Sequence, residues 1–316
     1  MTQHIYIYSP SSAVRDKAKF RRAVKRLEAM GHEVEVDEAA LASHQRFAGD
    51  DATRLAAIHR AAASGADVAL ISRGGYGLSR LLPQIRYKAL AKAIDKGTRF
   101  VGLSDFTALQ MALLATTGSV TWAGPALAED FGGEEAPDEI MQACFDDLLC
   151  GQGEGSGWRL PKATPLAAPV TTALSTARTD FQINQATLWG GNLAMLASLV
   201  GTPYLPQIKG GILFIEDISE HPYRVERMLT QLLHAGILGQ QKAVVFGQFT
   251  NYKLSSHDRG FKLDSVVTWL QSQIKARVLT GLPFGHVATK VLLPVGEKVT
   301  LAVEGRDAFL LWGHEH

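Results

Sequence analysis

The sequence predicts an α/β protein with two domains. These are an N-terminal domain with a parallel sheet of the Rossmann or flavodoxin type and a smaller, β-rich C-terminal domain of mixed α/β structure. Apolar runs alternate with helical patterns in the first half, which is typical of βαβ units. Helical patterns are fewer in the second half, where strand-like runs follow one another closely. The length of 316 residues exceeds what one small core needs. We expect domains at 1–155 and 178–316, joined by a linker at 156–177.

The first half begins with a predicted strand, IYIYS (5–9), which ends at Pro10-Ser11-Ser12, where a hydroxyl can cap the next helix. That helix carries Phe20, Val24 and Leu27 on one face and ends at Gly31. The alternation then continues with a strand at 32–36, a helix at 50–63, a strand at 66–73, a further helix, and a strand at 99–103. This order indicates a parallel sheet, in which ligands bind beyond the carboxyl ends of the strands.

The second half follows a stretch rich in Gly, Pro and Thr (152–172), which we interpret as a linker with little packing of its own. Gly190 and Gly191 are expected to form a turn, and Asn192 to cap a helix. The strand GILFIED (211–217) ends on two carboxylates. The remaining expected elements are an amphipathic helix from Pro222 to Gly236, a strand at 242–249, a loop with His286, and two strands joined through Pro294-Val-Gly296.

Composition excludes several classes of protein. The 32 Lys and Arg residues nearly balance the 31 Asp and Glu residues, and no basic stripe indicates nucleic-acid binding. No signal peptide and no membrane-spanning run is present in the sequence, so no membrane partner is expected. Cys144 and Cys150 fit neither a metal spacing nor a disulfide framework. No motif indicates a metal or another cofactor. We expect a cytoplasmic enzyme without cofactors.

Two segments at predicted strand ends are candidates for a site: RGGYG (73–77) and Leu103-Ser104-Asp105. RGGYG lacks the G-x-G-x-x-G fingerprint and the Lys-Ser/Thr pair of a phosphate loop. It is either a plain tight turn or a turn whose amides bind an anion. Gly102-Leu-Ser104 is similar to a nucleophile elbow, although Phe106 replaces the second Gly. Ser104 is therefore either a helix cap or a nucleophile.

Two further residues have both a structural and a catalytic interpretation. Glu216 follows five apolar residues, so it is either exposed at the strand tip or paired with a specific partner, and a salt bridge to Arg224 or Arg227 is the structural interpretation. His286 is either a surface residue or a base, whereas His221 beside Pro222 is typical of a cap. A Ser nucleophile needs an adjacent base, an acid that orients the base, and amides that bind the oxyanion. The order Ser, acid, His is compatible with such a triad.

Five motifs together resemble one known family. They are RGGYG, G-x-S-D-x-T-A (102–108), WGGNL with GTP, IED-x-x-E-x-x-x-R-V-E-R, and GLPFGH. Over nearly the whole chain, in this order, they are similar to the LD-carboxypeptidases, or muramoyltetrapeptide carboxypeptidases, which are serine peptidases of murein recycling. The resemblance is closest to the cytoplasmic proteobacterial enzymes. It implies the same two domains, with the site in the groove between them.

The resemblance also implies roles for particular residues. Ser104 is the nucleophile, His286 the base and Glu216 the acid of a Ser-His-Glu triad. The backbone amides of Gly75 and Asp105 form the oxyanion hole. This suggests a reason for the Gly-rich turn, since a Cβ there would obstruct the tetrahedral centre.

The implied reaction releases the terminal D-Ala from murein tetrapeptide through an acyl-enzyme. The partner is thus a small peptide, free or muramyl-linked, and we assign Arg73 and Tyr76 to its binding. Microcin-immunity peptidases, which cleave a peptidyl or aminoacyl nucleotide amide, are the alternative from the same family. A murein-peptide binding module without catalysis is the alternative from another class. Homodimers are frequent in the family, and a homodimer is expected here by analogy.

Overall fold

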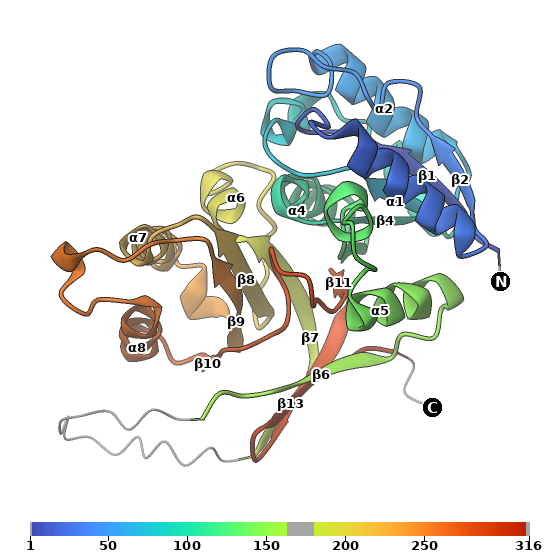
Figure 1. Cartoon of the computed structure of the whole chain (residues 1–316). Helices are drawn as coiled ribbons and strands as arrows, with labels where there is room; N and C mark the ends of the chain where they lie inside the picture. The colour runs from blue at the N-terminus through green and yellow to red at the C-terminus, as the bar shows by residue number, and fades with distance from the viewer. Residues whose placement is uncertain (1, 163–179, 314–316) are drawn as a thin grey trace.

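The structure is a computed structural model that describes residues 2–162 and 180–313. It contains two sheets, which lie in the two halves of the molecule (Figure 1). The first sheet has six strands in the order β11-β5-β4-β3-β1-β2, and the second has seven in the order β10-β9-β8-β7-β12-β13-β6. The predicted two-domain α/β architecture is therefore confirmed.

Five strands of the first sheet are parallel. They are β1 (His4–Tyr8), β2 (Glu33–Val36), β3 (Val68–Ile71), β4 (Arg99–Gly102) and β5 (Thr121–Ala123). Their order, 2-1-3-4-5, is that of the flavodoxin type. Helices cover both faces. One apolar cluster joins the sheet to α1 (Lys17–Ala29) and α5 (Glu139–Cys150), and another joins it to α2 (Asp51–Ala63), α3 (Tyr87–Asp95) and α4 (Thr107–Thr117).

The expected serine cap of α1 is wrong. Asp16 caps this helix, and its carboxylate accepts a hydrogen bond from Lys19 N. Ser11 and Ser12 instead contact the segments that follow β3 and β4. The chain therefore places these two hydroxyls at the carboxyl edge of the sheet, beside the candidate site.

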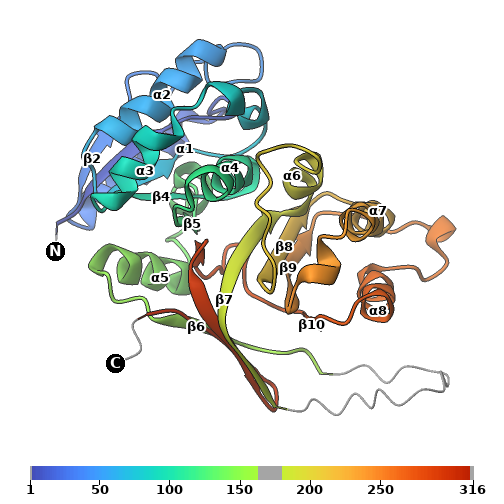
Figure 2. The ribbon, with the colours of Figure 1, turned by 180° about the vertical axis from the view of Figure 1, so that it is seen from behind.

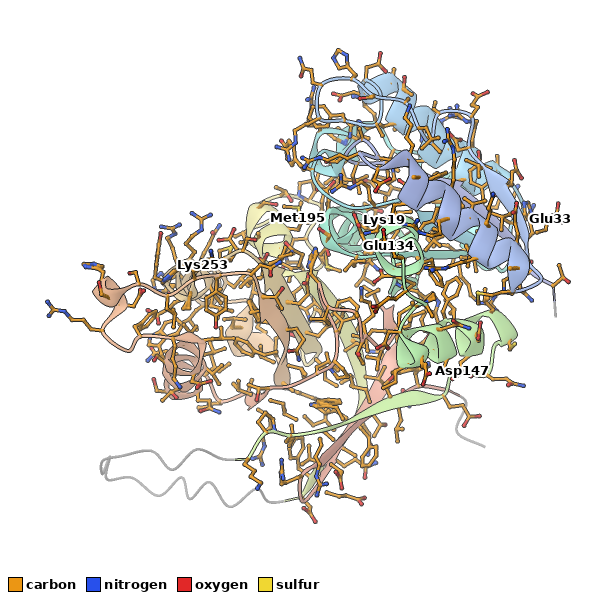
Figure 3. The ribbon with its side chains drawn as sticks, in the orientation of Figure 1. Lys19, Glu33, Glu134, Asp147, Met195 and Lys253 are labelled. Carbon is orange, nitrogen blue, oxygen red and sulfur yellow. The ribbon has the colours of Figure 1, made fainter. Side chains whose placement is uncertain are left out.

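Some cations of α1 bind a neighbouring segment. Lys19 forms an ion pair with Glu129 at 3.1 Å, and Arg22 donates to Gly132 O. Glu129 lies in a short π-helix, Leu127–Phe131, which packs on α1. Figure 3 labels Lys19 and Glu134 where these segments meet. Helix α1 thus fixes the position of the π-helix.

The second sheet combines parallel and antiparallel pairing. Strands β7 (Phe181–Asn192), β8 (Ile212–Ile218), β9 (Ala243–Thr250) and β10 (Arg277–Leu279) are parallel. Strands β12 (Lys298–Glu304), β13 (Asp307–Leu311) and β6 (Gly155–Arg159) continue the sheet from β7 in antiparallel fashion. Helices α6 (Leu193–Ser198), α7 (Pro222–His234) and α8 (Leu263–Gln273) complete this half.

The end of β7 differs from the expected turn. Gly190 and Gly191 are the last strand residues before Asn192, with φ of +132° and +135°. A Cβ at Gly190 would collide with the backbone of Phe214 in β8. Glycine is therefore required by the close approach of two strands. The predicted cap is confirmed, since Asn192 Oδ1 accepts a hydrogen bond from Met195 N at 3.2 Å.

Two strands cross the boundary that the sequence suggested. β6 lies in the segment expected to be a linker, yet it pairs with β13 and buries Trp158. β11 (Leu293–Val295) belongs to the C-terminal half but pairs antiparallel with β5 in the first sheet. Pro294 therefore lies within a strand, and β11 and β12 belong to different sheets. Residues 163–179 of the expected linker lie outside the described residues.

The two halves also pack directly on each other. Helix α4, which follows the candidate nucleophile, contacts both α6 and β7. Figure 2 shows α4 and α6 side by side at the junction of the halves. The carboxyl ends of β4 and β8 are thereby brought toward the same junction.

Candidate active site

Ser104 lies in a strained turn between β4 and α4. Its φ is +65°, a left-handed conformation that costs a non-glycine residue on the order of 1–3 kcal/mol. A Cβ at Gly102 would lie 2.7 Å from Ile71 Cδ1 and 2.8 Å from Phe106 Cδ1, so a larger residue there would displace the side chains packed around the elbow. The side chain of Ser104 caps neither the 3-10 turn at Ser104–Phe106 nor α4. The cap interpretation is therefore wrong, and the turn has the geometry of a nucleophile elbow.

The Gly-rich turn after β3 packs against this elbow. A Cβ at Gly74 would lie 2.7 Å from Ser104 Cβ and 2.9 Å from its Oγ. A Cβ at Gly75, whose φ is +117°, would instead collide with the Ser12 hydroxyl. Gly74 thus makes room for the serine, while Gly75 makes room for Ser12. The reason suggested for Gly75, an obstructed tetrahedral centre, is corrected accordingly.

The two amides expected to form an oxyanion hole belong to this turn and this elbow. In the described part of the chain, the backbone amides of Gly75 and Asp105 donate no hydrogen bond to a protein acceptor. The first belongs to the residue after Gly74, which packs against Ser104, and the second belongs to the residue after Ser104. Such amides are suitable donors for an oxyanion that forms beside the serine.

Glu216 and His286 form a buried pair at the end of β8. Glu216 has no exposed surface, and its Oε2 lies 2.7 Å from His286 Nδ1. Its Oε1 accepts a hydrogen bond from Asn192 Nδ2 at 3.2 Å. The alternative salt bridge to Arg224 or Arg227 is absent, since Arg224 pairs with Glu220 and no ion pair joins Arg227 to Glu216 among the described residues. The carboxylate therefore orients an imidazole.

The environment of His286 suits a general base. Burial lowers the pKa of the imidazole, but the hydrogen bond that it donates to Glu216 and the charge of this carboxylate outweigh burial and leave the pKa raised. The positive charge of Lys290 acts in the opposite direction. Because Nδ1 is bound to Glu216, Nε2 is the nitrogen available to a serine. In the described residues, no hydrogen bond joins Ser104 Oγ to His286. In unliganded enzymes, the distance between nucleophile and base often shortens on substrate binding.

Asn192 is a site residue that the sequence predicted only as a cap. Its Nδ2 donates to both Glu216 and Asp217, the latter at 3.0 Å. Its backbone amide donates to Thr107 Oγ1 at 3.0 Å, three residues beyond Ser104. Asn192 thus joins the start of α4 to the acid of the pair. The pairing of β7 with β8, which places Asn192 beside Glu216, was not visible in the sequence.

Asp217 has a different role from its neighbour. It accepts hydrogen bonds from Ala194 N at 2.9 Å and Ile218 N at 2.8 Å, and so holds the start of α6. Burial, followed by the charge of Glu216, raises the pKa of Asp217 to about 6. Only one of the two carboxylates that end β8 contacts the histidine.

The loop that carries His286 is attached to the N-terminal half. Lys290 and Asp130 of the π-helix form a buried ion pair, with side chains 3% and 5% exposed. Thr289 Oγ1 donates to Asp138 Oδ2 at 2.6 Å. His286 therefore contacts its acid in one half, while its loop is held by the other half.

The remaining residues that the sequence singled out have other contacts. His221 caps α7, as predicted, and its Nε2 lies 3.2 Å from Asp258. Arg73 donates to Ala13 O and lies 3.6 Å from Glu129. Tyr76, which is 39% exposed, packs against Phe47. The assignment of Arg73 and Tyr76 to substrate binding stays a prediction.

The described residues contain no group of three or more His, Cys, Asp or Glu side chains arranged to bind a metal ion. Within the same residues, each helix is too short or too polar to cross a bilayer.

Known structures share this fold. The crystal structure of a muramoyltetrapeptide carboxypeptidase from Oxalobacter formigenes superimposes with a TM-score of 0.84, at 38% identity, over 99% of this chain and 100% of that chain. The fold and the likeness to this enzyme define the protein as a peptidase with two α/β domains. Profiles of the N-terminal and C-terminal LD-carboxypeptidase domains match residues 5–124 and 185–301. The chain therefore belongs to the LD-carboxypeptidase family.

Two further relatives indicate the range of this family. A protein of Bacillus subtilis (strain 168), described as a probable murein peptide carboxypeptidase, is 29% identical over 93% of this chain and 88% of its own length. The microcin C7 self-immunity protein of Escherichia coli is 26% identical over 74% of this chain and 70% of its own. The chain is thus similar both to a probable murein peptide carboxypeptidase and to a microcin self-immunity protein.

Proposed function

We propose that the protein is a serine carboxypeptidase that removes the terminal D-Ala from murein tetrapeptide. The observation that carries this proposal is the buried Glu216–His286 pair, joined through Asn192 to the segment that holds a strained Ser104. Likeness to the Oxalobacter enzyme and to the Bacillus protein supports the murein peptide as substrate.

The proposed chemistry assigns a step to each of these residues. His286 Nε2 accepts the proton of Ser104, and the alkoxide attacks the carbonyl of the amide to D-Ala. The amides of Gly75 and Asp105 bind the oxyanion. The protonated imidazole then gives its proton to the amine of D-Ala, which leaves. Water, activated by the same imidazole, releases the tripeptide from the serine. Glu216 keeps the imidazole in the correct tautomer and stabilises its positive charge.

Replacing Ser104 by Ala tests this mechanism directly. The variant should lose nearly all turnover, with unchanged folding, when mass spectrometry follows the release of one alanine from murein tetrapeptide. Wild-type protein should be labelled by a fluorophosphonate at Ser104. Ser198→Ala is the control, because Ser198 is an exposed residue of α6 whose hydroxyl only contacts Met195 O. Near-normal activity of the Ser104→Ala variant would refute the triad.

The second candidate is cleavage of a peptidyl or aminoacyl nucleotide amide, supported by similarity to the microcin C7 self-immunity protein. Incubation with an aminoacyl sulfamoyl nucleotide separates the two, since this candidate requires release of the amino acid. A binding module without catalysis would bind murein peptide but resist fluorophosphonate.

We further propose a cytoplasmic location, a homodimer, and use of the free or muramyl-linked peptide. Cell fractionation, size-exclusion chromatography with light scattering, and competition between the two peptides test these points.

A further inference from the structure

The carboxyl group of Asp105, the residue after Ser104, is buried and has contacts that catalysis by the triad does not explain. The residue is 1% exposed. Its Oδ2 accepts hydrogen bonds from Ser11 Oγ at 2.7 Å and from Leu78 N at 2.9 Å. The amide of Gly77 also faces this carboxyl group. Oδ1 is buried without a hydrogen-bond partner. The side chain therefore connects three segments that are distant in sequence.

These contacts fix the Gly-rich turn on one side. Gly77 ends the turn that contains Gly75 and Leu78 directly follows it, so a bond to Leu78 N restrains the end of that turn. Asp105 is also the residue whose own backbone amide is the second expected oxyanion donor. Asp105 thus supplies one oxyanion donor through its backbone amide, and its side chain holds the turn that carries the other donor, the Gly75 amide.

Ser12 restrains the turn on its opposite side. Ser12 Oγ accepts a hydrogen bond from Tyr76 N at 3.2 Å, and Ser12 N donates to Gly74 O at 3.4 Å. The adjacent Ser11 is bound to Asp105. The Gly75 amide therefore lies between two restrained positions of the turn. Leu78 is held by Asp105 directly, and Gly74 and Tyr76 are held by Ser12, whose neighbour Ser11 binds Asp105.

A buried arginine, Arg54, packs against the end of the Gly-rich turn. Arg54 has no exposed surface, donates to Pro10 O at 3.1 Å and lies 2.5 Å from Asp51. A Cβ at Gly77 would collide with the Arg54 guanidinium. Burial raises the pKa of the Asp105 carboxyl group, and the positive charge of Arg54 acts in the opposite direction without reversing this.

We infer that the Asp105 side chain is a positioning residue that sets the spacing between the Gly75 and Asp105 amides, and thereby shapes the oxyanion hole. The inference rests on the proposed function, because it assumes that Ser104 is the nucleophile. Loss of one oxyanion donor costs serine peptidases about 10²–10³-fold in kcat. Because the donors bind charge that develops in the transition state, the loss falls on kcat rather than on KM.

Two substitutions at position 105 separate positioning from charge. Asp105→Ala removes the acceptor for Leu78 N and Ser11 Oγ, so the turn is released. Asp105→Asn keeps an oxygen that can accept both bonds, and its amide group takes the place of the unpartnered Oδ1. We expect kcat to fall at least 100-fold in the Ala variant and less than 10-fold in the Asn variant, with KM within threefold of wild type in both.

The matched control is Asp37→Asn. Asp37 is also a buried carboxylate, 3% exposed, that accepts from Tyr6 Oη at 2.6 Å and from Ala39 N at 2.9 Å, and it forms an ion pair with Arg60 at 2.8 Å. It lies just beyond β2, at the edge of the first sheet. This variant should lower the melting temperature but leave kcat per folded molecule unchanged.

The experiment measures three quantities for each full-length variant: the rate of fluorophosphonate labelling at Ser104, kcat and KM on murein tetrapeptide, and the melting temperature. In the phosphonylated serine the phosphoryl oxygen occupies the oxyanion hole, so labelling tests the hole without a peptide. A labelling rate reduced at least 100-fold in Asp105→Ala, and restored by Asn, supports the inference. A loss of activity that only follows the folded fraction, with normal labelling of the folded molecules, would overturn it.

The same measurements distinguish failure of the inference from failure of the proposed function. Wild-type protein that is labelled at Ser104 but releases no alanine refutes the murein substrate, while the labelling rates still decide the role of Asp105. Wild-type protein that is not labelled at Ser104 refutes both the nucleophile and the inference.

Discussion

Replacing Gly74 by Ala should reduce catalysis without unfolding the protein. The added Cβ would lie 2.7 Å from Ser104 Cβ and 2.9 Å from Ser104 Oγ, whereas ordinary contacts begin at 3.4 Å. The serine or the turn must therefore move by about 0.7 Å. The φ of Gly74 is not in the left-handed region, so the backbone can accept alanine. The strain thus falls on the position of the nucleophile.

A displacement of about 1 Å costs an enzyme on the order of 10²-fold. We therefore expect kcat/KM of the Gly74→Ala variant to fall about 10- to 100-fold, which corresponds to ~1.4–2.7 kcal/mol of transition-state stabilisation. Gly239→Ala is the control, because Gly239 has no heavy atom within 4 Å of an added Cβ and no positive φ. Alanine release, measured with melting curves, gives the answer. Activity of Gly74→Ala within twofold of the control would refute the proposed contact between turn and nucleophile.

Three other substitutions give distinct outcomes. Glu216→Gln removes the charge that raises the pKa of His286, so the acid limb of kcat/KM should move to lower pH, while kcat falls by up to about 10⁴-fold. Lys290→Met removes a charge that lowers the same pKa, so the limb should move to higher pH; leaving Asp130 unpaired should cost about 3–5 kcal/mol in chemical denaturation. Shifts of the same sign in both variants would contradict this electrostatic account. Thr107→Val removes the acceptor for the backbone amide of Asn192 and should lower the free energy of unfolding by about 1–3 kcal/mol. Thr107→Ser keeps the hydroxyl and should retain this stability.

Local patterns predicted much of the fold. The helix expected at 50–63 is found at Asp51–Ala63, and the strand expected at 211–217 is found at Ile212–Ile218. Both depend on side-chain periodicity and on nearby turn residues, which a single sequence contains. β6 was missed because its residues, GSGWR, do not alternate in polarity and become a strand only by pairing with β13.

The site was predicted to a different extent. Motifs and family resemblance selected Ser104, Glu216 and His286, and the structure places the last two in contact. The residues that connect them were not predicted. Lys290 and Asp130 are separated by 160 positions, and Ser11 and Asp105 by 94. The first contact follows from the packing of the two halves and the second from the order of the strands in the first sheet, neither of which periodicity encodes.

The pairing of β11 with the first sheet has a consequence for any attempt to separate the two halves. A fragment that ends before residue 155 would lack this strand and expose the edge of β5, together with the apolar surface that Leu293 and Val295 cover. Unpaired sheet edges of this kind promote aggregation. The complementary fragment would contain β11 without its partner strand, β5. The protein should therefore melt in one cooperative transition, and chimeras that join the halves of two relatives should fold only when β11 and the first sheet come from the same parent.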